Sequence, residues 1–549
     1  MNNTGYKRYP GIILFLTLSF IMVLPFELYP HYRPMIELSK PQPPPTVDPG
    51  PDAALLRVCL RDAATGRIVS ATACVNDGAQ EPDRDGYSRF SLRRSGNRMK
   101  GPIRFRPLKY YFYTDGRFEV RVPPGTVTLE FGKGYEYAQR KVSLRAAPGD
   151  TVELDVSLER WIDMAVSGWY SGDTHIHMNR TGANDDTLLA VTSAKDIRYA
   201  YLLSMNTGGY GQGKEYESWL QAEGLGDGST SNLGPYFISS GQEYRTGTLG
   251  HVTIIMTDSY VPGAGFVEDV EKGPSLGVIA DQTHKLRGFI GLAHGGYHCQ
   301  EADGILLADK MDFLELLQFG GYRSLGLDGW YDFLNLGYRL PIVGACDFPY
   351  TRELGSEITY IWSDSVPSPR SFAQGLVNGK SFVTSGPMLF LTVGGKKPGE
   401  IISFAGGADT TLNVKLEVKS EIYPVRYLEL IVNGWVVVRE MIPETKTGWQ
   451  LEHRLRVTGS VWVAARTYSH AGTEAHTNPV YIYVRGRLPF NRDSARNIAA
   501  RLDGSIEEIP CRDVVEKLKA AKTQLERLLT RQEHSLPLPA IPLTKGLIE

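Results

Sequence analysis

The chain has 549 residues, of which 42% are hydrophobic and 10% aromatic, which is enough apolar material for several folded domains. Its 59 basic and 61 acidic side chains nearly cancel and leave a net charge of −2 with histidine neutral. This balance excludes the basic composition typical of nucleic-acid-binding proteins, so we expect no nucleic-acid partner.

The first 34 residues have the pattern of a secretory signal. Lys7 and Arg8 precede residues 11–26, which are almost continuously apolar. This run is shorter than an average membrane-spanning helix of about 20 residues, and no small-residue cleavage site follows it. We favour an uncleaved signal that acts as a membrane anchor, with a cleaved signal peptide as the alternative. Either places the bulk of the chain outside the cytoplasm, as a periplasmic, envelope-anchored or secreted protein, behind a proline-rich linker over residues 35–54.

Residues 55–160 predict a small β-sandwich. Alternating apolar and polar residues mark strands at 56–62, 67–76, 117–122, 127–130 and 152–158. The run Thr-Asp-Gly-Arg-Phe-Glu-Val-Arg-Val-Pro-Pro-Gly, from Thr114 to Gly125, resembles carboxypeptidase regulatory-like domains. That resemblance implies a scaffold or docking module without chemistry of its own. Cys59 and Cys74 fall on neighbouring expected strands, where an extracytoplasmic location permits a disulfide bond.

A ligand-rich strand begins the next segment. Asp173, His175 and His177 alternate with Thr174 and Ile176. In an extended strand alternate side chains point the same way, so the three ligand-type groups face one point. Imidazole nitrogen and carboxylate oxygen both bind zinc, manganese or iron. The pattern predicts a metal site; the alternative is a strand whose histidines only hydrogen-bond to the backbone or to water.

Further ligand-type side chains stand at the ends of later apolar runs. They are Glu243, His251, His294, Glu315 and Asp347. Segments that read as helices, at 187–195, 276–287 and 330–338, separate several of these runs, which predicts parallel βαβ units. In a closed βα barrel functional groups gather at the C-terminal ends of the strands, so we expect one convergent site.

Several of these blocks resemble a known family. They are Gly172-Asp-Thr-His-Ile-His177, Gly241-Gln-Glu243, His251, Ala293-His294-Gly-Gly, Gly344-Ala-Cys-Asp347 and Gly379-Lys-Ser-Phe-Val-Thr-Ser-Gly-Pro387. They are similar to the PHP (polymerase and histidinol phosphatase) superfamily, and most of all to its CehA/McbA-type, carbaryl-hydrolase-like branch. The resemblance covers roughly residues 161–402 and implies a metallohydrolase acting on phosphoesters, amides or carbamates. The expected fold class is therefore α/β, with a distorted TIM-like βα barrel over residues 161–399 flanked by two small β-sandwiches.

The resemblance also implies the ligands. The matching positions are His175, His177, Glu243, His251, His294 and Asp347, with Glu243 as the carboxylate that bridges two metals. Two departures concern the number of ions: Asn206 ends a strand where many members have an Asp-His pair, and Phe348 stands where many have histidine shortly after the aspartate. We therefore expect one or two divalent transition metal ions rather than three. Asp185 or Asp186 could add a carboxylate, although aspartate at a helix start is more often an N-cap.

The expected chemistry is attack by a metal-activated water on a small-molecule or polymer-fragment substrate. Asp347 is the expected general base, with His298 as the alternative that protonates the leaving group. Arg245 is expected to stabilise developing negative charge. A non-catalytic envelope-associated binding protein for a glycan or protein ligand, on a decayed scaffold, is the second hypothesis. The retained ligand types favour the enzyme.

The C-terminal part returns to β-structure and then to helices. Residues 400–486 alternate as strands and predict a second β-sandwich without clustered ligands. Residues 487–549 predict a helical tail, with helices at 489–503 and 511–529. In the second helix an apolar stripe predicts a packing face, formed by Val514, Val515, Leu518, Leu525 and Leu528. The sequence indicates no oligomeric state.

Overall fold

The computed structural model describes residues 47–80, 111–178, 180, 184–205, 225–246, 249–264, 274–297, 299–348, 350–351, 353–407, 409–509 and 512–531. The expected signal or anchor and most of the linker lie outside these residues. Within them, no helix combines the length and the apolar character needed to span a bilayer.

The expected α/β class is wrong, because the described part of the chain is mostly β, with 42% strand and 22% helix arranged in several sheets. The central sheet is also mixed rather than parallel. Strand β9 (Tyr199–Met205) runs parallel to β8 (Trp169–Ile176) and β11 (Tyr236–Arg245), whereas β12 (His251–Ile255) runs antiparallel to β11. Helical crossovers allow parallel pairing, but only a short loop joins β11 to β12, so these two form a hairpin.

The N-terminal β part has two small sheets around one core. Their orders are β4-β1-β7 and β3-β2-β5-β6. The strands are β1 (Ala54–Asp62), β2 (Ala71–Val75), β3 (Phe112–Thr114), β4 (Arg117–Val122), β5 (Gly125–Gly132), β6 (Arg140–Ala146) and β7 (Thr151–Leu158). On β1 every second side chain is buried, as period-two patterning requires. Cys59 on β1 and Cys74 on β2 lie in different sheets, and both are free cysteines.

The central sheet continues into the C-terminal β part. Its remaining central strands are β10 (Ser231–Leu233), β13 (Phe289–Leu292), β14 (Phe313–Gln318), β15 (Gly321–Tyr322), β16 (Ile342–Gly344), β17 (Ile358–Trp362) and β18 (Ser381–Thr384). The later strands are β19 (Met388–Val393), β20 (Ile401–Phe404), β21 (Thr410–Lys419), β22 (Val425–Val432), β23 (Trp435–Met441), β24 (Gly448–Val457), β25 (Val461–Ser469), β26 (Glu474–Thr477) and β27 (Val480–Val484). Because β18 pairs with β26, hydrogen bonding crosses the boundary expected at residue 399; a separate sheet, β19-β21-β24, packs beside it.

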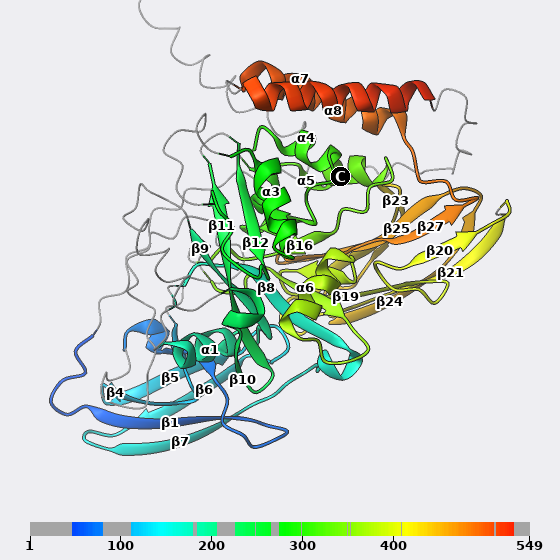
Figure 1. Ribbon diagram of the computed structural model, residues 1–549. Helices are drawn as coiled ribbons and strands as arrows, with labels where there is room; N and C mark the ends of the chain where they lie inside the picture. Colours follow the sequence, from blue (N-terminus) through cyan, green and yellow to red (C-terminus); the bar gives the residue numbers. More distant parts are fainter. Residues whose placement is uncertain are drawn as a thin grey trace, which may run out of the picture.

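Helices cover the central strands (Figure 1). They are α1 (Asp185–Ala194), α3 (Leu276–Lys285), α4 (Ala302–Leu307), α5 (Gly326–Leu334), α6 (Pro369–Val377), α7 (Arg492–Glu508) and α8 (Arg512–Arg531). Figure 1 shows α7 and α8 as a red hairpin lying over α4 and α5. Arg501 of α7 pairs with Asp303 and Asp332, and Leu518 of α8 lies in the same core cluster as the central strands.

A buried ionic cluster joins the N-terminal β part to the central part. Arg160 contacts Glu136 at 2.5 Å and Asp196 at 2.9 Å, and both carboxylates are at most 2% exposed. Lys133 donates to the carbonyl of Ser193 at the C-terminal end of α1. These contacts fix α1 and the turn before β9 against the N-terminal sheets.

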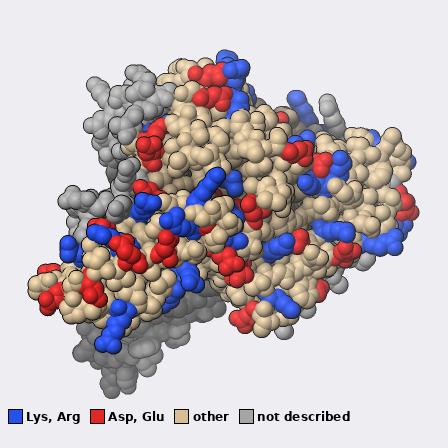
Figure 2. All heavy atoms as spheres, turned by 90° about the horizontal axis from the view of Figure 1, so that it is seen from below, with Lys and Arg blue, Asp and Glu red and all other residues tan. Residues whose placement is uncertain are grey.

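The surface carries charges of both signs. On the face shown in Figure 2, lysine and arginine side chains alternate with aspartate and glutamate over the described atoms. No single-sign field dominates that face, so its charge gives no preference for a strongly charged partner.

Candidate metal centre

Strand direction explains why distant residues meet. The strands β8, β11, β13, β14 and β16 belong to parallel pairs, so their C-terminal ends share one edge. His177 follows β8, Glu243 is near the end of β11, and His294 and Asp347 follow β13 and β16. His251 opens β12, and because β12 is reversed its first residue lies at that same edge.

All six expected ligands form one cluster. His177 Nε2 lies 3.1 Å from Asp347 Oδ1 and 3.3 Å from Glu243 Oε2. His175 Nε2 lies 3.3 Å from Asp347 Oδ1. Glu243 Oε1 lies 3.2 Å from His251 Nδ1 and 3.3 Å from His294 Nε2. One carboxylate therefore presents one oxygen to His177 and the other to His251 and His294, the arrangement that a bridging ligand requires.

The described residues contain two ligand groups that could each hold one ion. They are His175 with His177 and Asp347, and His175 with Glu243 and His294; within each, the ligand atoms lie within 4.8 Å of one another. His175 belongs to both groups. One imidazole nitrogen binds one ion, so these groups are two alternative ways to hold an ion around His175, and the expected second ion stays a prediction.

Hydrogen bonds on the far side of the rings orient the nitrogens. Nδ1 of His175 lies 2.7 Å from Glu315 Oε2, and Nδ1 of His177 lies 3.0 Å from the carbonyl oxygen of Leu203. Nδ1 of His294 lies 2.7 Å from Gln318 Oε1. A carboxylate or carbonyl oxygen only accepts, so each Nδ1 donates and each Nε2 turns a lone pair to the cluster.

The cluster is rich in acceptors that lack donors. Glu243 Oε2, His251 Nδ1 and Asp347 Oδ1 are buried and make no hydrogen bond to any described group. Such atoms are costly unless a proton or a cation compensates them. The donor set of imidazole nitrogens and carboxylate oxygens fits zinc, manganese or iron.

The pKa shifts of His175 and Glu243 also indicate that positive charge is favoured at the cluster. Burial disfavours the His175 imidazolium, but the carboxylates of Glu315, Asp347 and Glu243 outweigh burial and raise the pKa of His175 well above its ordinary value. Burial opposes ionisation of Glu243 as well, yet Arg245 and His175 hold the pKa of its carboxyl well below the usual range. The carboxylates therefore favour positive charge around His175, whereas burial lowers the pKa of His251.

Two of the expected ligands sit on left-handed backbone. His294 has φ 55° and Asp347 has φ 51°, a region that non-glycine residues enter at a cost. Gly295 follows with φ 61°, and a Cβ there would lie 2.4 Å from the carbonyl oxygen of Arg323. The turn after β13 that aims His294 therefore requires glycine at position 295.

The three aspartates considered as additional ligands lie outside the two ligand groups. Asp173 is fully buried, and its Oδ1 accepts from the backbone N–H groups of His175 and Cys346; burial raises the pKa of its carboxyl to about 7. Asp185 pairs with Arg180, and Asp186 is an exposed residue in the first turn of α1. Neither is part of the ligand groups.

Of the expected catalytic residues, Asp347 lies within the cluster, Arg245 lies beside it and His298 is outside the described residues. Arg245 Nε lies 3.7 Å from Glu243 Oε2, and its guanidinium lies 5.6 Å from the ring centroid of Tyr350. Its side chain is 24% exposed, whereas that of Glu243 is 1% exposed, so Arg245 lies between the buried cluster and the surface. His298 lies outside the described residues.

The role of Glu315 and Gln318 was missed. Both are fully buried on β14 and orient histidine rings rather than face the cluster. Glu315 stands out in sequence as a ligand-type residue within an apolar run, but nothing local tells whether it meets a metal or the back of a histidine.

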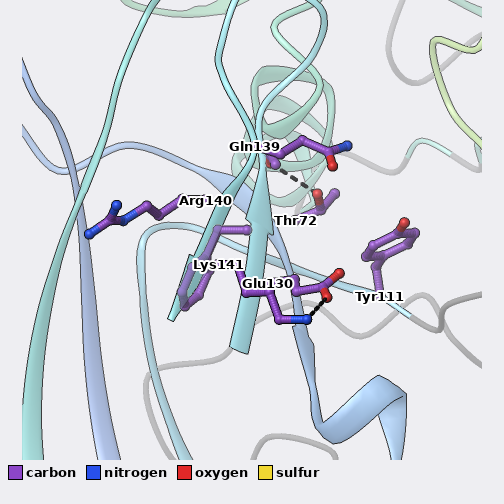
Figure 3. Close-up of a pocket in the computed structure, with 8 residues that line it drawn as sticks. Thr72, Tyr111, Glu130, Gln139, Arg140 and Lys141 are labelled. Carbon is purple, nitrogen blue, oxygen red and sulfur yellow. Dashed lines mark hydrogen bonds and ion pairs between the residues drawn. The ribbon is translucent and has the colours of Figure 1, made fainter. Parts of the chain in front are cut away.

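A cavity of about 230 Å³ lies elsewhere, on the N-terminal sheet (Figure 3). Thr72, Glu130, Arg140 and Lys141 are among its lining residues, and Lys141 pairs with Glu130 at 3.2 Å. None of the expected ligands lines it, so it is separate from the metal cluster.

No known protein family and no curated protein matches the chain. Among solved structures, the fibronectin(III)-like modules of Clostridium thermocellum CbhA are 15% identical, and the match covers 18% of this chain and 97% of theirs with a TM-score of 0.13. An engineered protein is 11% identical over 55% of this chain and 52% of its own, with a TM-score of 0.15. At these TM-scores neither likeness bears on fold or function, and the resemblance to the PHP superfamily stays a prediction.

Proposed function

We propose that the chain is an extracytoplasmic, metal-dependent hydrolase that directs a metal-activated water at a phosphoester, amide or carbamate bond. The observation that carries the proposal is the convergence of four histidines and two carboxylates, from five separate segments, on one buried acceptor-rich cluster. A purely structural core does not gather acceptors without donors, because each such atom costs free energy.

The residues divide into holding and reacting groups. His175 would hold an ion either with His177 and Asp347 or with Glu243 and His294, and His251 lies beside Glu243 as a further ligand. A divalent transition ion bound there would supply Lewis-acid chemistry, polarising the substrate's carbonyl or phosphoryl oxygen and lowering the pKa of water to about 7.

Asp347, besides holding an ion, and Arg245 would take part in the reaction. Asp347 Oδ2, 3.7 Å from His294 Nδ1, is the carboxylate oxygen left to accept a proton from the water. Burial alone would lower the pKa of Arg245, but Glu243 and Tyr350 raise it, so the guanidinium stays charged beside the cluster. There it would stabilise negative charge that develops on the substrate.

The test is metal analysis of the purified protein followed by assays with phosphomonoesters, phosphodiesters, carbamates and arylamides. His175→Ala is expected to lose metal and hydrolysis together, since His175 belongs to both ligand groups. His470→Ala, which alters an exposed histidine, is the control and should keep both. A wild-type protein without bound divalent metal, or full activity in His175→Ala, would overturn the proposal. A protein that binds metal but cleaves none of these bonds would favour the non-catalytic binding protein instead.

A further inference from the structure

Glu315 is a carboxylate in the middle of β14 with no exposed surface. A buried carboxylate is costly unless hydrogen bonds saturate it. Its Oε1 accepts from the hydroxyls of Thr174 and Thr253, each at 2.9 Å, and its Oε2 lies 2.7 Å from His175 Nδ1. Three strands, β8, β12 and β14, therefore meet on this one side chain.

The two threonines hold the carboxylate of Glu315 in one orientation toward His175. Because both hydroxyls bond one oxygen of the carboxylate, the other oxygen is held toward His175, and a half-turn of the group only exchanges two equivalent oxygens. The ring must then carry its proton on Nδ1. Its Nε2 is left as a lone pair 3.3 Å from Asp347 Oδ1 and 3.6 Å from Glu243 Oε1.

The other histidines are supported differently. Nδ1 of His177 and His294 meet neutral acceptors, the Leu203 carbonyl and the Gln318 amide. Of these three rings, only that of His175, which belongs to both ligand groups, has a carboxylate behind it among the described residues. A carboxylate behind a ligating imidazole fixes its tautomer and makes the ring a stronger donor to metal.

We propose that Glu315, held by Thr174 and Thr253, is a positioning residue that fixes the tautomer and orientation of His175 and so raises the metal affinity of the whole centre. The inference rests on the proposed function, since it requires a metal at the cluster. It adds a residue outside the ligand set whose effect is exerted only through His175.

The experiment compares metal affinity in wild type and Glu315→Gln by competition with a chromophoric chelator, using zinc and cobalt(II). Glutamine has nearly the same shape but loses the negative charge. We expect the same number of bound ions with affinity lowered roughly 10- to 100-fold, and a shifted visible spectrum of bound cobalt, because His175 donates more weakly. Glu301→Gln is the matched control: Glu301 is also a buried carboxylate, 3% exposed, but it accepts from the backbone of Leu276 and should leave affinity and spectrum unchanged.

A second variant protects the test against misfolding. Thr174→Val with Thr253→Val leaves Glu315 in place and removes both hydroxyl donors, and it should also weaken metal binding with the spectral shift. Wild-type affinity and spectrum in Glu315→Gln, or in the double threonine variant should Glu315→Gln not fold, would overturn this inference while the metal site itself survives. A wild-type protein that binds neither metal would overturn the proposed function and this inference with it.

Discussion

Nε2 of His175 and Nε2 of His177 lie 3.1 Å apart. His175 is on β8 and His177 directly follows it, so both side chains point to the same side. Each ring donates its Nδ1 proton away from the cluster, so two lone pairs face each other. Two lone pairs at this distance repel unless a positive charge lies near both. Asp347 Oδ1 is within 3.3 Å of both nitrogens, and these three residues form one of the two groups that could hold a metal ion.

Asp347→Asn should separate catalysis from metal binding. The amide keeps an oxygen for a metal but cannot take up a proton at neutral pH, so kcat should fall about 100-fold or more while metal content stays near that of wild type. Metal content measured by emission spectrometry, beside kcat on the best substrate, checks this. Loss of metal in proportion to activity would make Asp347 a ligand without a role as base.

Gly295→Ala should distort the turn that aims His294. The new Cβ would meet the Arg323 carbonyl at 2.4 Å, in addition to the left-handed strain of φ 61°. Gly326→Ala is the matched control, because it has the same φ of 61° but open space around the Cβ. The control should cost about 1–2 kcal/mol of unfolding free energy, and Gly295→Ala clearly more. The unfolding free energy from denaturant unfolding, together with metal affinity, is measured for both variants. Equal losses of unfolding free energy in the two variants would mean that the close approach to Arg323 is relieved at no cost.

Arg160→Leu should weaken the junction between the N-terminal β part and α1. It leaves Glu136 and Asp196 buried without their shared cation, a change that typically costs about 3–5 kcal/mol. Arg456→Leu removes an exposed pair with Asp409 and should change the melting temperature little. Scanning calorimetry compares the two, and similar melting temperatures would show that the buried cluster contributes no net stability.

Glu301→Gln should change how stability depends on pH. Burial raises the pKa of Glu301 to about 7, against 4.5 in an unfolded chain. Between these values the folded protein keeps a proton that the unfolded chain releases, so the contribution of Glu301 falls as pH rises from about 4.5 to about 7, by on the order of 3 kcal/mol. The glutamine variant does not titrate, so its unfolding free energy should decline less over that range. Parallel curves from urea unfolding at several pH values would contradict this.

The local pattern of apolar and polar residues predicted many of the strands and helices. Alternation at Asp173, His175 and His177 identified a strand with ligand-type side chains, and the strands expected at 56–62, 117–122 and 152–158 correspond to β1, β4 and β7, whereas β3 and β6 were not expected. The helix expected at 276–287 is α3, Leu276–Lys285, whereas α5 begins at Gly326 rather than near residue 330. Such signals depend on neighbouring residues alone, so they can be read from the chain in order.

Strand direction and hydrogen-bond roles were decided only in three dimensions. The reversal of β12 made the central sheet mixed, yet the same reversal delivers His251 to the edge where the parallel strands end. Whether a buried polar side chain such as Glu315 faces the cluster or the back of His175 depends on which strands become neighbours. Sequence determined which residues carry ligand atoms; pairing between distant strands determined where those atoms point, because pairing energy depends on partners that the local sequence does not specify.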